Sequence, residues 1–193
     1  MNQKEFLSKI HIYLKQHLSK KRYNHTLAVN ELAVKLADFY KLDVFKCTAA
    51  ALLHDCAKNM SVDEMKKYIT KNKLKIKDCS FVTEHLPQVL HSYIGADIAA
   101  KLFGIKDKDI LNAVKNHTVG RTKMSDYEKI LFLADALSAD RKYDKSFVPE
   151  KVLFGDLNKA FKLVLQNKIK YVVANFSVLH PDIVKIWNHY VNV

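Results

Sequence analysis

An adjacent histidine and aspartate, His54 and Asp55, end a run of small and apolar residues. Cys47 and Ala51 lie seven and three residues before His54, so the imidazole shares their buried helical face. A carboxylate beside such an apolar stretch is costly unless a cation compensates its charge. Imidazole and carboxylate both bind divalent metals, so a metal is one such cation. The dipeptide alone favours a plainer reading, a histidine at a helix end beside a solvated aspartate.

A second acidic residue, Asp135, is the only charged residue in the apolar stretch 130–137. Leu131 and Phe132 precede it on the same helical face, which places the carboxylate at the protein interior or at its edge. A buried carboxylate needs a partner. A metal ion and a structural ion pair with lysine or arginine meet that need equally well.

Three further histidines occupy comparable positions. His25 follows Arg22 by three residues on one helical face, and His91 opens an apolar helix. His117 lies where another apolar helix ends, just before Thr118. A single histidine in such a position is usually a cap or a packed core residue, but the repeated coincidence with helix ends and inner faces favours a shared site.

Helical periodicity dominates the segments that must position these residues. Asp43 is a predicted N-cap, and Ser61 and Ser125 open capping boxes. We expect helices over about 6–18, 27–40, 44–54, 62–70, 88–103, 107–117, 126–137, 155–175 and 182–191. Gly104 is expected to end one of them, and Pro181 to begin the last. Residues 71–83 and 138–150 are predicted loops.

The composition is that of a helical protein that binds anions. The chain has 193 residues with only four Gly and three Pro, which argues against a turn-rich all-β fold. We therefore predict an all-α fold in one domain over 1–193, with the motif core at about 20–141 and C-terminal helices over 150–193 closing the pocket. The net charge of +12 suits nucleotides, nucleic acid or an acidic surface.

The sequence also carries expectations about location. Three cysteines without metal-type spacing argue against a disulfide framework and favour a reducing compartment. No signal peptide or membrane-spanning run is expected. We expect a cytoplasmic protein without a membrane partner or an obligatory nucleic acid, and a homodimer is compatible with the sequence.

The order His25, then His54-Asp55, then Asp135, all on predicted helices, resembles the HD superfamily of metal-dependent phosphohydrolases. The segments 22–27, 51–58, 112–121 and 129–135 look like its YqeK-type branch, a bacterial group of symmetrical diadenosine tetraphosphate hydrolases. The resemblance runs from about residue 20 to residue 182. The chain departs from the family pattern at Ser92-Tyr93, at Thr122-Lys123 and over 136–140, without losing a proposed ligand.

The resemblance implies a helical bundle around catalytic iron, as one or two ions, with manganese or cobalt as substitutes. The implied iron ligands are His25, His54, Asp55 and Asp135. His91 and His117 would complete a second metal site or contact the nucleotide phosphates, and the sequence does not decide between the two.

The resemblance also implies roles in catalysis and substrate binding. Asp55, Lys58 and His117 are the implied catalytic residues, with Asp55 orienting the attacking water or bridging two metals. The implied contacts with the nucleotide are Arg22, Lys58, His91, His117, Thr118, Arg141 and His180.

The implied reaction is hydrolysis of diadenosine tetraphosphate to two ADP by a metal-activated water. One alternative is a nucleotidase or phosphodiesterase that uses the same scaffold on another nucleotide. A second alternative is a non-enzymatic RNA-binding or ribosome-binding protein, suggested by the lysines at 66, 67, 71, 73, 75 and 77. No known RNA-binding module with its stacking aromatics is recognised in the sequence, so a solvated face explains these lysines better.

Overall fold

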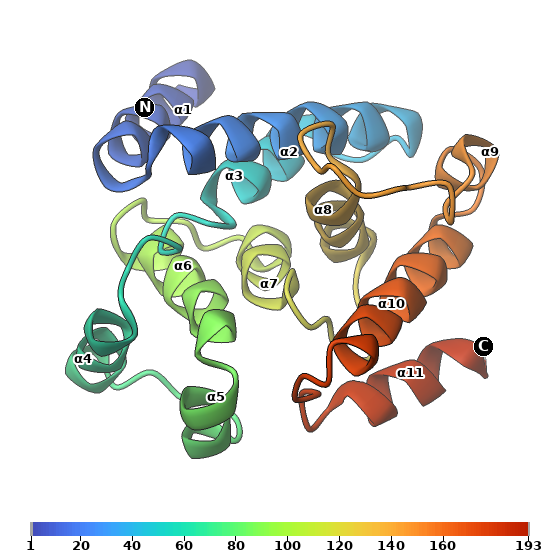
Figure 1. Ribbon diagram of the computed structural model, residues 1–193. Coiled ribbons are helices and arrows are strands. Elements are labelled where there is room, and N and C mark those ends of the chain that lie inside the picture. The colour runs from blue at the N-terminus through green and yellow to red at the C-terminus, as the bar shows by residue number, and fades with distance from the viewer. Residues whose placement is uncertain (1, 193) are drawn as a thin grey trace.

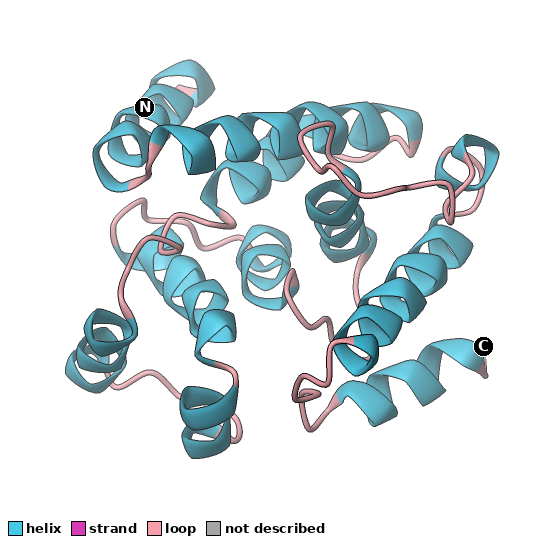
Figure 2. Cartoon of the chain, viewed as in Figure 1, coloured by secondary structure: helices cyan, strands magenta, loops and turns pink. Residues whose placement is uncertain are grey.

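The computed structural model describes residues 2–192, and every regular element in that range is a helix (Figures 1 and 2). The α-helices are α1 Gln3–His17, α2 Lys20–Phe39, α3 Val44–Leu53, α4 Val62–Asn72, α5 Cys79–His85, α6 Leu90–Lys101, α7 Lys108–Asn116, α8 Asp126–Leu137, α9 Glu150–Leu153, α10 Leu157–Ala174 and α11 Ile183–Val191, with a 3-10 turn at Pro87–Val89. The all-α prediction is confirmed.

The predicted caps begin three of these helices. The Asp43 carboxylate accepts hydrogen bonds from the backbone N–H groups of Phe45 and Lys46 at the start of α3. Ser61 and Ser125 form the expected capping boxes of α4 and α8. A cap satisfies N–H groups that have no partner within the helix, so these residues fix where the three helices begin.

Several predicted boundaries need correction. Residues 79–85 form α5 rather than part of a loop, because Val82 and Leu86 are buried in the core. The helix expected to reach Gly104 ends at Lys101, and Gly104 has a φ of +68° in the turn that follows. The last helix begins at Ile183, two residues after Pro181.

The core lies where α2, α3, α7 and α8 pack together, with α6 against α7 and α10 against α8. In Figure 1, α2 crosses the top of the view above α6, α7 and α8. Phe132 of α8 and Phe161 of α10 are fully buried, with ring centroids 5.0 Å apart. This packing brings the C-terminal end of α3 to the middle of the molecule, between α2 and α7.

Two surface features bear on the sequence predictions. The lysines of the 66–77 segment are exposed, as expected of a solvated face. Among the described residues, no helix is long and apolar enough to cross a membrane.

Candidate functional site

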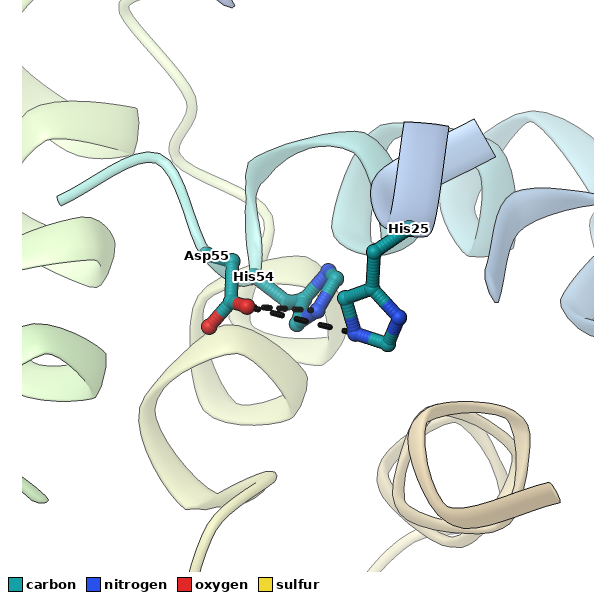
Figure 3. A group of neighbouring side chains, drawn as sticks. All are labelled: His25, His54 and Asp55. Carbon is teal, nitrogen blue, oxygen red and sulfur yellow. Dashed lines mark ion pairs between the residues drawn. The ribbon is translucent and has the colours of Figure 1, made fainter. Parts of the chain in front are cut away.

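His54 and Asp55 lie at the C-terminal end of α3, and both are buried, with 0% and 3% of their surfaces exposed. The preceding turns of α3 are apolar and buried, so the chain leaves the helix inside the core. The reading of Asp55 as a solvated residue is therefore wrong. Figure 3 shows the His54 ring beside the carboxylate, with His25 of α2 approaching from the opposite side.

Each oxygen of the Asp55 carboxylate faces a different pair of histidines. Oδ2 lies 3.5 Å from His54 Nε2 and 4.0 Å from His25 Nε2. Oδ1 lies 3.0 Å from His91 Nε2 and 3.7 Å from His117 Nε2. The two groups, His25-His54-Asp55 and Asp55-His91-His117, each consist of buried residues, and they share Asp55.

The backbone fixes three of these imidazoles in one tautomer. His54 Nδ1 lies 2.6 Å from the Ala51 carbonyl oxygen, and His117 Nδ1 lies 2.7 Å from that of Val114. His91 Nδ1 lies 2.5 Å from the carbonyl oxygen of the residue three positions earlier. A carbonyl oxygen only accepts, so each Nδ1 carries a proton, and each ring, when it is neutral, presents the Nε2 lone pair to the site.

The site fits a divalent metal. Two ligand atoms that each lie about 2.1 Å from the same ion are about 3–4 Å apart. The distances between the Asp55 oxygens and the four histidine Nε2 atoms fall in this range. His54 Nε2 is buried and has no hydrogen-bond partner, as expected of a metal-ligating atom in a structure without the metal. His54 and His117 also cap the C-terminal ends of α3 and α7, where the helix dipole favours a positive charge.

The protonation states in the site suit metal ligands. Burial would raise the pKa of Asp55, but the charge of His54 and the contacts with His117 and His91 hold that pKa well below its usual range. Burial would lower the pKa of His54, but the Asp55 carboxylate raises it instead. Burial prevails at His91, where it lowers the pKa. Asp55 would therefore be an ionised ligand to a bound metal, and His54 would bind it only after losing a proton from Nε2.

Burial also lowers the pKa of His117, to about 4. Because the same imidazole titrates near 6.5 in an unfolded chain, only the unfolded state gains this proton between the two values. The free energy of unfolding of the metal-free protein should therefore fall as the pH drops from about 6.5 to 4, by up to about 3 kcal/mol from this residue. Urea unfolding at about pH 7 and about pH 4.5 measures the loss. The His117→Gln protein should lose less than wild type, and an equal loss would contradict the assignment.

Asp135 forms an ion pair with Arg141 and also lies beside the predicted metal ligand His25. Its Oδ1 lies 3.2 Å from His25 Nε2, and the same oxygen accepts a hydrogen bond from Arg141. Burial would raise the pKa of Asp135, but His25 and the nearby cations hold it well below its usual range. Within residues 2–192, neither metal-type group includes Asp135. In this structure it is therefore an ion-pair partner of Arg141 that touches one predicted ligand.

Most of the predicted substrate contacts surround the same cluster. Arg22 donates to Asp55 Oδ2 at 2.8 Å. Lys58 Nζ lies 3.3 Å from His91 Nδ1, as a neighbour rather than a donor, because that nitrogen already carries its proton. Thr118 donates to Ser92, the buried residue at one of the departures from the family pattern.

His180 is the predicted residue that the structure does not bring to this cluster. Its Nδ1 accepts a hydrogen bond from the Asp182 N–H, and Asp182 pairs with Lys77. Its Nε2 is buried without a hydrogen-bond partner.

Two residues of the site escaped the sequence analysis. Asp140 Oδ2 lies 2.8 Å from His25 Nδ1. This carboxylate is the hydrogen-bond partner of the His25 Nδ1 atom, whereas the Nδ1 atoms of the other three rings contact backbone carbonyl oxygens. Lys168 lies 3.4 Å from the His117 carbonyl oxygen. The sequence held a signal for Lys168, a charged residue on the same helical face as the apolar residues Phe161, Val164 and Leu165. Asp140 had none, because 115 residues separate it from His25.

Replacing Asp140 with asparagine should weaken metal binding by about 10- to 100-fold, because the partner of a ligating imidazole sets its orientation and basicity. Asp144→Asn is the matched control, since Asp144 is in the same loop and bonds only to Ser146 among the described contacts. Manganese titration of both proteins measures the effect. Equal affinities in the two variants would show that Asp140 does not support His25.

Comparisons with known proteins agree with this geometry. The HD domain family model matches residues 22–140. Proteins named symmetrical bis(5'-nucleosyl)-tetraphosphatase are 36% identical in Halalkalibacterium halodurans, over 91% of both chains, and 31% identical in Bacillus subtilis, over 97% of both. The one in Staphylococcus aureus is 37% identical over 91% of this chain and 90% of its own.

A solved structure shares the whole fold. The crystal structure of a Clostridium acetobutylicum protein, described as a predicted HD superfamily hydrolase involved in NAD metabolism, is 34% identical with a TM-score of 0.88. The match covers 96% of this chain and 97% of that one. The chain therefore belongs to the HD domain family, in the group that includes the symmetrical bis(5'-nucleosyl)-tetraphosphatases.

Proposed function

We propose that this protein hydrolyses diadenosine tetraphosphate symmetrically to two ADP and that a divalent metal held around Asp55 is required. The observation that carries the proposal is the set of imidazole Nε2 atoms that face both oxygens of one buried carboxylate. The names of the relatives support this substrate. When bound, the metal supplies Lewis acidity toward water and toward a phosphoryl oxygen.

The proposed metal is iron, with manganese or cobalt as substitutes, and the proposed number of ions is two. Mixed imidazole and carboxylate ligands suit all three metals. His25, His54 and Asp55 would hold one ion, with Asp135 as a further ligand once it leaves Arg141. Asp55, His91 and His117 would hold the other. The shared carboxylate supports this pairing, because its two oxygens already face the two groups.

The charges around the cluster suit a polyphosphate. The cationic side chains that act on Asp55 and Asp135 are Arg22, Lys58, Arg141 and Lys168. They outnumber the two carboxylates, so the site attracts further negative charge. Lys58 and Arg141 would bind phosphoryl oxygens and neutralise the charge that builds up there during cleavage. Asp55 would orient the attacking water.

We place the reaction in the cytoplasm, in keeping with three free cysteines, of which Cys47 and Cys56 are buried. Product analysis tests the proposal. Manganese-loaded enzyme and diadenosine tetraphosphate should give ADP as the sole nucleotide product. Release of AMP and ATP would contradict symmetrical cleavage. Activity confined to a nucleoside monophosphate or a cyclic dinucleotide would favour the nucleotidase or phosphodiesterase alternative, with the metal site intact.

A further inference from the structure

Lys168 places a positive charge beside the cluster without belonging to the ligand set. It lies on α10, partly buried, with Nζ 3.9 Å from the ring centroid of Phe132. The same Nζ lies 3.4 Å from the carbonyl oxygen of His117 and 3.5 Å from that of Thr118. The ammonium is therefore held between an aromatic face and the C-terminal end of α7.

No carboxylate balances this charge at close range. Among residues 2–192, Lys168 forms no ion pair within 4.0 Å, whereas Lys129 pairs with Asp126 at 2.9 Å and Lys46 with Asp107 at 2.9 Å. A buried charge without a partner is costly, so a site of this kind is completed by an anion.

Lys58 is a second amine without an ion-pair partner among the residues described, and it lies beside His91, whereas Lys168 lies beside the backbone of His117. Its Nζ lies 3.3 Å from His91 Nδ1, and the described part of the chain offers it no carboxylate within 4.0 Å. His91 and His117 are neighbours, with their Nε2 atoms 3.2 Å apart. One unpaired amine thus adjoins His91, and the other adjoins the backbone of His117.

We propose that Lys168 binds an oxygen of the substrate's polyphosphate chain while Lys58 binds another, so that the two amines select chains of several phosphates over a single phosphate ester. This inference rests on the proposed function, which supplies the polyphosphate. A polyphosphate carries negative charge on successive groups, so different groups can contact the two amines, whereas a single phosphate ester has only one such group. The competing role for Lys168 is structural, as a cap for the carbonyls at the end of α7.

Kinetics with two substrates separate the two roles. In the manganese-loaded enzyme, Lys168→Gln keeps a hydrogen-bond donor for the carbonyls of α7 but removes the charge. We expect kcat/KM for diadenosine tetraphosphate to fall about 10- to 100-fold, the value of a hydrogen bond to a charged group. Hydrolysis of bis(p-nitrophenyl) phosphate should change little, and Lys168→Arg should recover part of the loss. Lys170→Gln, an exposed lysine on the same helix, is the control.

Equal losses on both substrates, or wild-type kinetics in Lys168→Gln, would overturn the proposal. A binding measurement keeps it separate from the proposed function. Even if the wild-type protein does not cleave diadenosine tetraphosphate, calorimetry with inorganic tripolyphosphate should show about tenfold weaker binding to the manganese-loaded Lys168→Gln protein. Equal affinity of wild type and variant for tripolyphosphate would also overturn it.

Discussion

The Asp55→Ala enzyme should hydrolyse diadenosine tetraphosphate on the order of 10³-fold more slowly than wild type, or worse. Asp55 is the residue common to both metal-type groups in the described chain, so its loss removes a ligand from each of them. It also leaves Arg22 without the carboxylate that it contacts at 2.8 Å. The variant should therefore lose bound metal and also the contact that orients Arg22, a predicted substrate-binding residue.

The matched control is Asp109→Ala. Asp109 also forms an ion pair, with Lys46 at 2.9 Å, but it belongs to neither group. Its loss should change kcat/KM less than about twofold, as is usual for a partly exposed ion pair. The rate of ADP release by both variants, with circular dichroism to check their helix content, measures the difference. Asp55→Ala activity within about tenfold of wild type would contradict the account.

The second large effect concerns the turn between α7 and α8. The Glu128 carboxylate is fully buried and accepts two hydrogen bonds from Arg121, at 2.8 and 2.6 Å, and one from Asn116, at 2.7 Å. Arg121→Met leaves this charge short of its cationic partner. We expect the free energy of unfolding to fall by about 3 kcal/mol, at the lower end for a broken buried pair because Arg121 is partly exposed.

Urea unfolding with a chelator present measures this loss without a contribution from the metal. Arg121→Lys should lose less, because it keeps the charge but not the two-pronged geometry. A loss below about 1 kcal/mol in Arg121→Met would show that Asn116 and the Ser125 cap satisfy Glu128 by themselves. His117 lies before this turn and Asp135 after it, so the metal affinity of Arg121→Met should fall as well.

The fold could be predicted from the sequence wherever a local rule decides the structure. Asp43, Ser61 and Ser125 begin their helices as expected, because an N-cap acts within four residues of chain. The apolar stripes of α3 and α8 are equally local, and both are buried. α5, which lies in a segment predicted as a loop, has only seven residues, and its N-cap Asp78 makes no side-chain cap hydrogen bond. Burial of Val82 in the core stabilises this helix, which no local pattern reveals.

The sequence predicts which residues form the site and in what order they occur along the chain, but not how their side chains are arranged in space. Adjacent residues such as His54 and Asp55 are visible in the sequence, and so is their order relative to His25 and Asp135. The division of the Asp55 oxygens between two histidine pairs depends on how α2, α6 and α7 pack. The carboxylate of Asp140 and the amine of Lys168 reach the cluster only through the loop after α8 and through α10.

Metal analysis of the purified protein tests the central claim most directly. After loading with manganese and exhaustive dialysis, wild type should retain about two ions per chain, and the His54→Ala and Asp55→Ala proteins should retain less than about one-tenth of that amount. Folded wild-type protein without bound metal, or variants that retain as much metal as wild type, would contradict a metal centre built on Asp55.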